Sequence, residues 1–494
     1  MEKLCRNLTN LEIDFPDKIR QEKILQFGEG NFLRAFVDYF IDELNTQGLF
    51  NGSIVIVQPI GKDTRHIDMI NAQDSLYTVV LRGLENNEKI VRQKVVSSVS
   101  RVLNLYRDFD EYMDTMKNSH LRFIVSNTTE AGIAYSETVK PTADAKEPPG
   151  SFPAKVTALL LERFNAFNGD PTKGFIFIPC ELIDYNGIKL KETVLRHSAD
   201  WGLPQEFVKW VNDCNHFTNT LVDRIVTGYP RDEADEFAES LGYQDNLLVT
   251  GEIFHFFAIE AGAEASKEID ETLPFRKAGL DVVLTDDATP YKLRKVRILN
   301  GAHTMSVLAA HMAGKETVGE MMEDSLFVDY LRKGIFEEII PTLSLPENEL
   351  KAFADSVFDR FANPFIKHYL MSIALNSVAK YNARVLPTIL DYHNKFAKFP
   401  AVLTFSFAAL IAFYKENGDD SPDVLDFMKT AWQSGSAESV AATVLANKNF
   451  WGADLTEISG FVQEVAKYLH GIETKGIKHE IHSVVSRRGQ IFHE

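Results

Sequence analysis

The order of predicted elements in the first half of the chain restricts the fold more than any other feature. Two short apolar stretches, KILQFGEG and SIVIVQP, have the pattern of buried strands, and NFLRAFVDYFIDELN between them has helical apolar spacing. Further strand patterns follow at YTVVLRG, LRFIVSNTT and GFIFIPCEL, with helical segments between them. Buried strands that alternate with helices predict a parallel, doubly wound α/β sheet.

The second half has a different texture, because helical spacing dominates it from TPYKLRKVRILNGAHTMSVLAAHMAG onward. Thr289 suits the N-cap of the first of these helices, and Pro290 suits its first helical position, where a missing amide hydrogen costs nothing. We therefore expect two domains. An α/β domain would span residues 1–286, and a mainly α-helical domain would span residues 287–494.

The charge balance argues against nucleic acid or a membrane surface as a partner. The 494 residues include 52 Lys and Arg against 70 Asp and Glu, a formal charge of -18 that repels phosphate backbones and anionic lipids. The three cysteines have no metal-ligand or redox spacing. The first residues lack a signal-peptide pattern, and the apolar run from Val402 to Tyr414 is too short to span a bilayer. We expect a cytoplasmic monomer or small homo-oligomer that binds a small molecule.

A turn with two glycines, GEGNFLRAF from Gly28, follows the first predicted strand and opens the first predicted helix. There Gly28 allows a tight turn, and Gly30 lets phosphate oxygens approach the backbone of Asn31 and Phe32 at the helix N-terminus. Leu33 replaces the third glycine of the usual GxGxxG pattern, so a purely structural turn fits as well. The βαβ setting favours the other interpretation, a Rossmann-type domain that binds a dinucleotide.

Two other predicted strand ends bear on the cofactor. In SNTTEAG, Asn127 and Thr128 are candidate cofactor contacts, because ligands of open α/β sheets bind beyond the carboxyl ends of strands. A polar turn capped by Asn127 is the structural alternative. The second strand ends at Gln58 instead of the carboxylate that would bind the adenosine ribose, which leaves the choice between NAD and NADP open. Lys62 and Arg65 nearby would bind a ribose phosphate or simply be solvated.

The stretch KVRILNGAHT places three chemically capable side chains within nine residues of a predicted buried helix. At about 100° per residue, Lys295, Asn300 and His303 lie within about 140° of one another on one face. Gly301 costs about 1 kcal/mol in a helix interior and fits a close approach to the backbone, which we attribute to a ligand. A solvated basic face and a hydrogen-bonded core histidine are the structural alternatives.

Hydride transfer between an alcohol and a nicotinamide would use these three groups. The reaction needs a general base for the hydroxyl proton and donors that stabilise the developing alkoxide, and a lysine, an asparagine and a histidine can supply them. We expect no metal, because no cluster of Cys and His has the spacing of zinc ligands.

KVRILNGAH resembles the KxxxxNxxH signature of the polyol-specific long-chain dehydrogenases, the mannitol dehydrogenase family. GEGNFLRAF, QDSLYT, LVDRI and RFANPFIKH are also similar, so the resemblance spans nearly the whole chain. It implies a Rossmann-type domain, a helical C-terminal domain and a metal-independent, NAD(P)-linked reaction between them. It also implies that Lys295 is the general acid/base, that Asn300 stabilises the oxyanion and that His303 binds and orients the substrate hydroxyl.

The resemblance extends to the substrate pocket, with departures. It implies that Asp223 in LVDRI lines the active site and that Lys380 in SIALNSVAKY binds substrate. Leu182 stands where the family has a second oxyanion asparagine, and Ser372 stands where it has an arginine. These two differences predict a rebuilt pocket that does not suit mannitol.

Four segments, GEGNFLRAFVDYFID, SNTTEAGI, PCELIDYNG and VDRIVTGYPRDE, are most similar to a branch of the family that acts on hexuronate-derived ketoacids. The resemblance implies the reversible reduction of tagaturonate to altronate with NADH. In an acidic chain, the carboxylate of such a substrate would pair with cations gathered on one C-terminal helix, namely Lys380, His368 and Arg384. Reduction of fructuronate, oxidation of mannitol or its phosphate, and a non-catalytic dinucleotide-binding redox sensor remain the alternatives.

Overall fold

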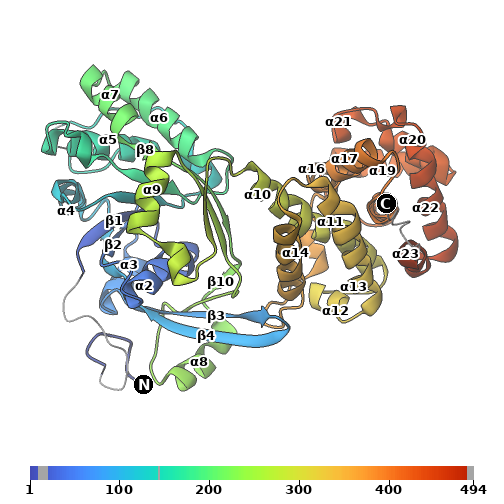
Figure 1. Ribbon diagram of the computed structural model, residues 1–494, viewed down its shortest axis with the longest axis horizontal. Helices are drawn as coiled ribbons and strands as arrows, with labels where there is room; N and C mark the ends of the chain where they lie inside the picture. Colours follow the sequence, from blue (N-terminus) through green and yellow to red (C-terminus); the bar gives the residue numbers. More distant parts are fainter. Residues whose placement is uncertain (9–19, 143–144, 487–494) are drawn as a thin grey trace. The chain divides into compact units, whose positions relative to one another are not determined.

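The computed structural model describes residues 1–8, 20–142 and 145–486 (Figure 1). The chain divides into two compact units. The first consists of Met1–Arg82 and Lys89–Ala288, and the second consists of Gly83–Glu88 and Thr289–Glu494. The short segment Gly83–Glu88 thus belongs with the helical unit although its neighbours in sequence belong to the first.

A six-stranded sheet forms the centre of the first unit and confirms the predicted doubly wound α/β fold. Its strands lie in the order β5-β2-β1-β6-β7-β8, and each neighbouring pair is parallel. Their bounds are β1 Glu22–Phe27, β2 Ser53–Gln58, β5 Val99–Asn104, β6 Phe123–Ser126, β7 Ile176–Pro179 and β8 His216–Phe217. This order consists of two three-stranded halves that diverge at β1 and β6, the arrangement of dinucleotide-binding sheets.

Helices bury both faces of this sheet, because successive strand residues point into different cores. Ile24 and Ile54 belong to a core with the helix after β1, whereas Leu25 and Val55 belong to a core with α5 and α6. Burial on both sides explains the nearly continuous apolar strands. The α-helices of this unit are α1 Asn31–Leu33, α2 Tyr39–Thr46, α3 Arg65–Ala72, α4 Phe109–Asp114, α5 Phe152–Ala166, α6 Asn186–Asp200, α7 Gln205–Cys214, α8 Ala234–Leu241 and α9 Ala263–Thr272.

The predicted strand YTVVLRG lies outside the parallel sheet, so its expected place was wrong. It forms β3 (Tyr77–Glu85), which pairs in parallel with β11 in a second sheet of order β10-β11-β3-β4. Asn86 and Asn87 have positive φ values of 55° and 64°, so the chain turns directly into β4 (Glu88–Val96) as the long hairpin visible in Figure 1. In the parallel sheet, β5 occupies the position beside β2.

The remaining strands complete the second sheet and form a third. The second sheet also contains β10 (Val226–Gly228) and β11 (Val249–Gly251), which are antiparallel. The third has the order β13-β12-β9, in which β12 (Phe256–Glu260) pairs in parallel with β13 (Val282–Thr285) and antiparallel with β9 (Asn219–Asp223).

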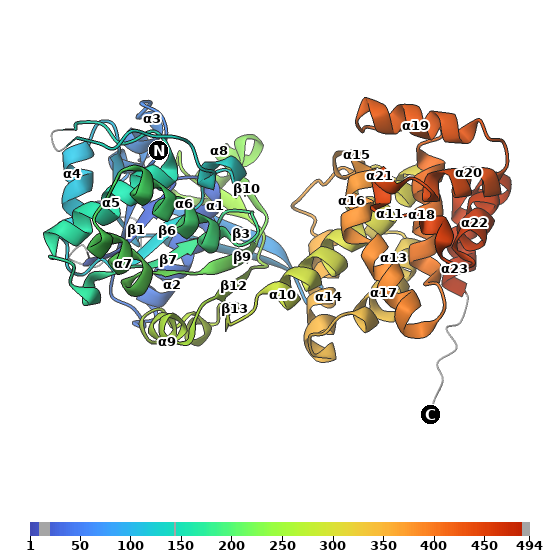
Figure 2. The ribbon, with the colours of Figure 1, turned by 90° about the horizontal axis from the view of Figure 1, so that it is seen from above.

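The described part of the second unit is mainly helical, which confirms the predicted character of the C-terminal half. Helix α18 (Ala401–Phe413) is buried almost all round and packs against α11, α22 and α23, which surround it in Figure 2. The α-helices are α10 Thr289–Arg294, α11 Gly301–Met312, α12 Val318–Met322, α13 Ser325–Arg332, α14 Glu347–Phe361, α15 Leu370–Ile373, α16 Ser377–Arg384, α17 Leu386–Phe396, α18, α19 Pro422–Trp432, α20 Ala437–Leu445, α21 Lys448–Trp451, α22 Phe461–Lys475 and α23 Ile477–Ser486.

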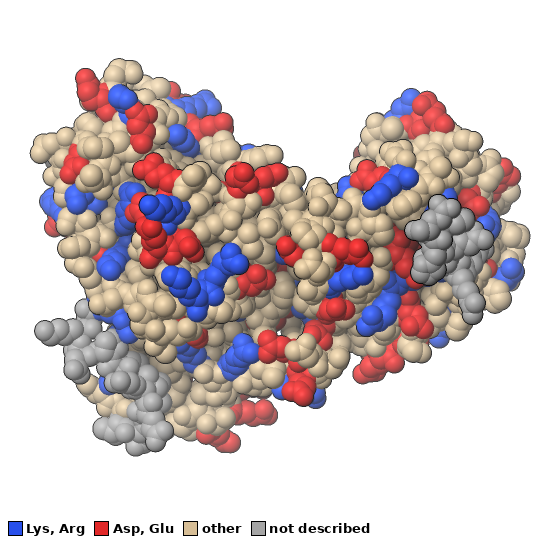
Figure 3. All heavy atoms as spheres, in the orientation of Figure 1, with Lys and Arg blue, Asp and Glu red and all other residues tan. Residues whose placement is uncertain are grey.

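Two further observations concern the length of the helices and the distribution of surface charge. Within the described ranges, no helix has both the length and the apolar character needed to span a bilayer. On the face drawn in Figure 3, acidic and basic side chains are interspersed, so the negative charge of the chain is not gathered in one patch of that face.

Candidate active site

The glycine turn lies where the two halves of the parallel sheet diverge. Phe27, the last residue of β1, pairs with Ser126, the last residue of β6. Gly28 has φ +119°, and a Cβ placed on it would lie 3.4 Å from the carbonyl oxygen of Asn127. The tertiary structure therefore brings together Gly28 and Asn127, two residues of the predicted cofactor set that are far apart in sequence, at the edge where such sheets bind dinucleotides.

The helix that follows the turn presents a fixed polar side chain. Gly30 caps the helix in extended conformation and has open space around it, and Asn31 is the first helical residue. The Asn31 Oδ1 atom accepts a hydrogen bond of 2.7 Å from Nη2 of Arg34, whose guanidinium is buried. The ring of Phe32 stacks on the buried ring of Phe36, one helical turn later, with centroids 4.9 Å apart. The predicted contacts Gly30, Asn31 and Phe32 are thus held on one rigid turn.

A buried carboxylate from the next strand end holds Thr128, and sequence reasoning missed it. Glu181 Oε1 accepts hydrogen bonds from the backbone N–H of Thr128 at 2.9 Å and from its hydroxyl at 3.2 Å, while Oε2 accepts one from Ser126 at 3.1 Å. Burial raises the pKa of Glu181, and these hydrogen bonds partly oppose that rise. Its position directly after the strand β7 is a signal that could have identified it.

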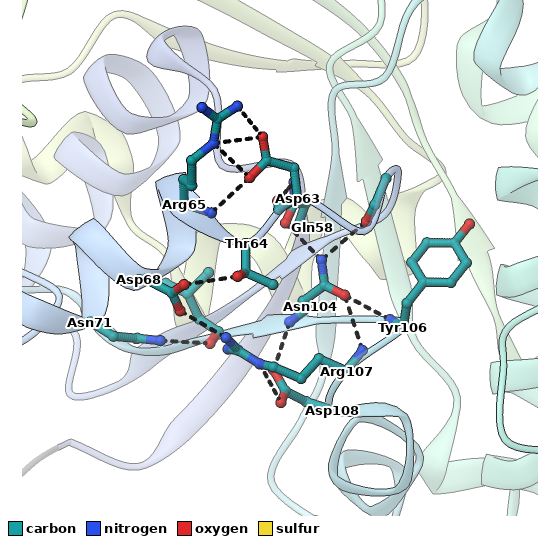
Figure 4. A network of polar contacts seen from close by, with 12 residues as sticks. Gln58, Asp63, Thr64, Arg65, Asp68, Asn71, Asn104, Tyr106, Arg107 and Asp108 are labelled. Atoms are coloured by element: carbon teal, nitrogen blue, oxygen red, sulfur yellow. Dashed lines mark hydrogen bonds and ion pairs between the residues drawn. The ribbon is translucent and has the colours of Figure 1, made fainter.

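The loop after β2 has an amide at Gln58, where a ribose-binding carboxylate would be expected, and its first carboxylate is Asp63. The Gln58 side chain accepts a hydrogen bond of 2.8 Å from Asn104, which ties the ends of β2 and β5 together (Figure 4). Asp63 is the first carboxylate after β2, and its side chain binds Arg65. Lys62 forms an ion pair with Glu147 at 2.8 Å. The two cations considered for a ribose phosphate therefore both have acidic partners.

The lysine helix contains a turn that the sequence did not reveal. Residues Lys295–Asn300 form a π-helical segment, in which Gly301 donates its N–H to the carbonyl of Val296, five residues earlier. Because bonding from i to i+5 lengthens the turn, Asn300 stands about one turn above Lys295, closer to it than α-helical counting predicts. Such turns are frequent at functional sites. Lys295, Asn300 and His303 are all half-buried.

Gly301 lies next to another helix of its own unit. A Cβ on Gly301 would lie 3.4 Å from the carbonyl oxygen of Arg384, the last residue of α16. This is an ordinary van der Waals distance, and it places the end of α16 beside the lysine helix. The expected close approach of a ligand to Gly301 stays a prediction.

His303 has a buried imidazole nitrogen, and its ring packs against two aromatic neighbours. Its ring stacks on Phe361 with centroids 4.1 Å apart and meets the ring of His368 edge-on at 5.3 Å. Its Nε2 atom is buried and has no hydrogen-bond partner among the described residues. Burial first, and then the nearby charges of His368, Arg360 and Arg384, hold the pKa of His303 well below its ordinary value. The ring is therefore neutral at physiological pH.

The predicted substrate-binding cations come from two segments, not from one helix. Lys380 and Arg384 are on α16, but His368 precedes α15, because the chain breaks at Asn376, which is left-handed at φ 52°. Lys380 Nζ donates to the carbonyl of Ile373 at 2.9 Å. Arg384 Nη1 lies 3.5 Å from the hydroxyl of Thr304, the residue after His303. Burial lowers the pKa of Lys380 and that of His368.

The candidate residues divide between the two units. The cofactor set and Asp223, a buried residue at the end of β9, belong to the first unit. Lys295, Asn300, His303, His368, Lys380 and Arg384 belong to the second. Arg360, whose charge acts on His303, is a further cation of this cluster that sequence reasoning did not select. In the parts of the chain that the structure covers, no three His, Cys, Asp or Glu residues are grouped so that they could hold a metal ion.

Comparisons with known proteins bear on the whole chain. Residues 22–271 match the mannitol dehydrogenase Rossmann domain, and residues 287–473 match the mannitol dehydrogenase C-terminal domain. An altronate oxidoreductase of Yersinia enterocolitica is 46% identical over 478 residues, which cover 94% of this chain and 97% of that protein. One of Escherichia coli is 46% identical over 481 residues, which cover 95% of this chain and 98% of that protein.

Two solved structures have the same fold at low sequence identity. A D-sorbitol dehydrogenase in substrate-free form is 22% identical with a TM-score of 0.77, and the match covers 94% of this chain and 95% of that one. A ternary complex of Pseudomonas fluorescens mannitol 2-dehydrogenase with NAD and D-mannitol is 22% identical with a TM-score of 0.63, and the match covers 95% of each chain. With both domain models matched and relatives at 46% identity over nearly its full length, the chain belongs to the mannitol dehydrogenase family.

Proposed function

We propose that the protein catalyses the reversible, NADH-linked reduction of D-tagaturonate to D-altronate. The observation that carries the proposal is the 46% identity to altronate oxidoreductases over 94–95% of the chain. The first unit has the strand order of a dinucleotide-binding sheet, and in the second unit His303 lies under the influence of the charges of His368, Arg360 and Arg384. These features suit the reduction of a keto group on a substrate that carries a carboxylate.

The turn after β1 fits a dinucleotide. Gly28 lies against the backbone of Asn127, and the space beside Gly30 is open, so phosphate oxygens would reach the amides of the helix N-terminus. Asn31, Phe32 and Thr128 would complete the contacts with the dinucleotide. When bound, NADH would supply a hydride to the carbonyl carbon of the substrate.

We favour NAD over NADP because of charges in the loop after β2. A ribose 2′-phosphate would need an uncompensated cation there, but Lys62 is paired with Glu147 and Arg65 with Asp63. The carboxylate of Asp63 would repel a phosphate and would accept a hydrogen bond from a free ribose hydroxyl. Asp63→Ser should therefore lower the preference for NADH over NADPH.

Lys295 would give a proton to the carbonyl oxygen as the hydride reaches the carbon, and it would take that proton back in the oxidation of altronate. Asn300, about one turn away on the π-helical segment, would donate a hydrogen bond to the developing alkoxide. The neutral ring of His303, whose Nε2 is buried without a partner among described residues, would donate a second one to the same oxygen. The proposed proton transfer needs no metal ion.

The carboxylate of the substrate would bind to the cations beside this centre. Lys380 and Arg384 on α16, together with His368, would pair with it, and Asp223 of the first unit would contact substrate hydroxyls. Burial, and to a smaller extent the charge of Arg384, lowers the pKa of Lys380. A bound carboxylate would favour the charged form of this lysine and so oppose both effects.

We further propose that the enzyme acts in the cytoplasm as a monomer or small homo-oligomer, without a membrane or nucleic-acid partner. The formal charge of -18 and the three cysteines without metal or redox spacing support this proposal. Size-exclusion chromatography with light scattering measures the oligomeric state, and a large assembly would contradict it.

The experiment that tests the substrate is NADH oxidation by the purified protein with tagaturonate and fructuronate side by side. We expect kcat/KM to be at least about tenfold higher for tagaturonate, the discrimination that about 1.4 kcal/mol provides. A preference for fructuronate, mannitol or mannitol phosphate would refute the assignment.

The catalytic roles are tested by Lys295→Met, with Lys292→Met on the preceding helix as a matched control. We expect the first variant to lose at least about 10³-fold in kcat while it binds NADH with unchanged Kd, and the control to retain activity. Removal of the charges of Lys380 and Arg384 should raise KM for tagaturonate more than it lowers kcat. Full activity of Lys295→Met would exclude the proposed general acid/base.

A further inference from the structure

The turn between β7 and α6 exposes two large apolar side chains at the carboxyl end of the parallel sheet. Leu182 and Tyr185 are 67% and 57% exposed, although exposure of such side chains to water is unfavourable. Tyr185 is also left-handed, at φ 55° and ψ 43°. A bulky residue rarely adopts this conformation, which persists only where the surrounding structure enforces it.

Buried hydrogen bonds on both sides hold this turn in place. Before Leu182, the Glu181 carboxylate is bonded to Ser126 and Thr128 at the end of β6. After Tyr185, the buried Asn186 side chain donates to the carbonyl oxygens of Pro179 and Glu181, at 3.1 Å each, and accepts the backbone N–H groups of Gly187 and Thr220, at 2.9 Å each. The two exposed side chains therefore stand on a rigid, strained turn, as strained residues at binding sites do.

The position of the turn in the sheet indicates which group it meets. The strands β6, β7 and β8 form one half of the dinucleotide-binding sheet, and the glycine turn after β1 belongs to the other. Each half takes one nucleotide. With the pyrophosphate at Gly28 and Gly30, the adenosine lies over β1, β2 and β5, so the nicotinamide nucleotide lies over the half that carries Tyr185. The dihydronicotinamide ring is flat and uncharged, and it suits an aromatic and aliphatic surface.

We propose that Leu182 and Tyr185 form the apolar surface against which the nicotinamide ring of NADH binds, and that Tyr185 contacts this ring directly. The inference rests on the proposed function, because it takes NADH as the cofactor. It adds a residue to the site that neither the glycine turn nor the lysine helix supplies. It also gives a reason for the left-handed backbone conformation of the exposed Tyr185.

The test compares NADH with ADP-ribose, which has the adenosine and the pyrophosphate but no nicotinamide. Tyr185→Gly is the informative variant, since glycine adopts the left-handed conformation without strain and the fold is retained. We expect its Kd for NADH, measured by fluorescence titration, to rise about tenfold, while its Kd for ADP-ribose stays within about twofold of the wild-type value. Tyr185→Phe, which keeps the ring, should bind both ligands like the wild type.

The control Met69→Ala removes another exposed apolar side chain of the same unit and should change neither Kd. An unchanged Kd for NADH in Tyr185→Gly, or an equal loss for both ligands, would overturn the inference. That result differs from a failure of the proposed function, in which the wild-type protein itself would neither bind NADH nor oxidise it.

Discussion

A buried carboxylate in the helix that follows the glycine turn should make the stability of the first unit depend on pH. Asp38 ends the π-helical turn that follows α1, has no exposed surface and accepts a hydrogen bond of 2.6 Å from the Tyr77 hydroxyl. Burial raises its pKa from the ordinary value of 3.8 to about 7. The folded state therefore holds this proton more tightly than the unfolded chain does.

The size and sign of the effect follow from this difference. A shift of roughly 3 pKa units corresponds to about 4 kcal/mol, at about 1.36 kcal/mol for each unit. Because the folded pKa is raised, the stabilising contribution is fully present below about pH 4 and is lost as the pH rises to about 7. Asp38→Asn cannot ionise, and its amide oxygen can take the place of Oδ2 and accept the hydrogen bond from Tyr77. Between pH 5 and 7.5 the variant should therefore gain about 2.5 kcal/mol of unfolding free energy relative to the wild type.

Urea unfolding followed by tryptophan fluorescence measures this difference. Substitution of Trp432 and Trp451 by phenylalanine leaves only Trp201 and Trp210, so the signal reports on the first unit. The reasoning is refuted if Asp38→Asn and the wild type show the same change in unfolding free energy between pH 5 and 7.5.

A matched control lies in the second unit. Glu338 is also fully buried with its pKa raised to about 7, and its two oxygens accept the backbone N–H groups of Val402 and Leu403 at 2.9 and 3.0 Å. Glu338→Gln should change the pH dependence of the second unit and leave the signal of Trp201 and Trp210 as it is. A change of that signal would show that the two units do not unfold separately.

Three further outcomes are expected. Gly228 has φ +82°, and in Gly228→Ala the Cβ would lie 2.7 Å from Asn31 Nδ2. This variant should bind NADH about tenfold more weakly in a fluorescence titration. An unchanged Kd would show that Asn31 does not contact the cofactor. Gly187→Ala would place a Cβ 2.0 Å from the carbonyl oxygen of Thr218 and should cost at least about 3 kcal/mol in urea unfolding; wild-type stability would contradict this packing. Because the pKa of His303 is held well below its ordinary value, the protonation of this ring should not change kcat/KM near pH 6.5. A limb of the pH profile near pH 6.5 that is present in the wild type and absent in His303→Gln would contradict this.

Local patterns were sufficient for the elements that carry the site. The apolar runs of β1 and β2 and the helical spacing between them are properties of neighbouring residues, so the βαβ unit could be predicted without the tertiary structure. The glycines after β1 and the spacing of Lys295, Asn300 and His303 are also local. Their chemistry could therefore be proposed from the residues, and the family resemblance supplied individual roles.

Partners that are distant in sequence escaped such reasoning. The strand β3 has the pattern of a buried parallel strand, but Asn86 and Asn87 turn it into a hairpin, and the less apolar β5 takes the place beside β2. The cations expected on one helix come from two segments, because Asn376 is left-handed. Strand pairing and helix breaks of this kind depend on contacts that sequence periodicity does not encode.

The sequence by itself determined the two-part architecture, the glycine turn and the three residues of the lysine helix, because each depends on the order of nearby side chains. Only the tertiary structure decided that Gly28 lies against Asn127, that the backbone of Arg384 lies beside Gly301, and that a π-helical turn brings Asn300 towards Lys295. It also produced the neutral imidazole of the half-buried His303 and the strained conformation of Tyr185. The physical reason is that burial, desolvation and backbone strain arise from packing between segments that are far apart in the chain.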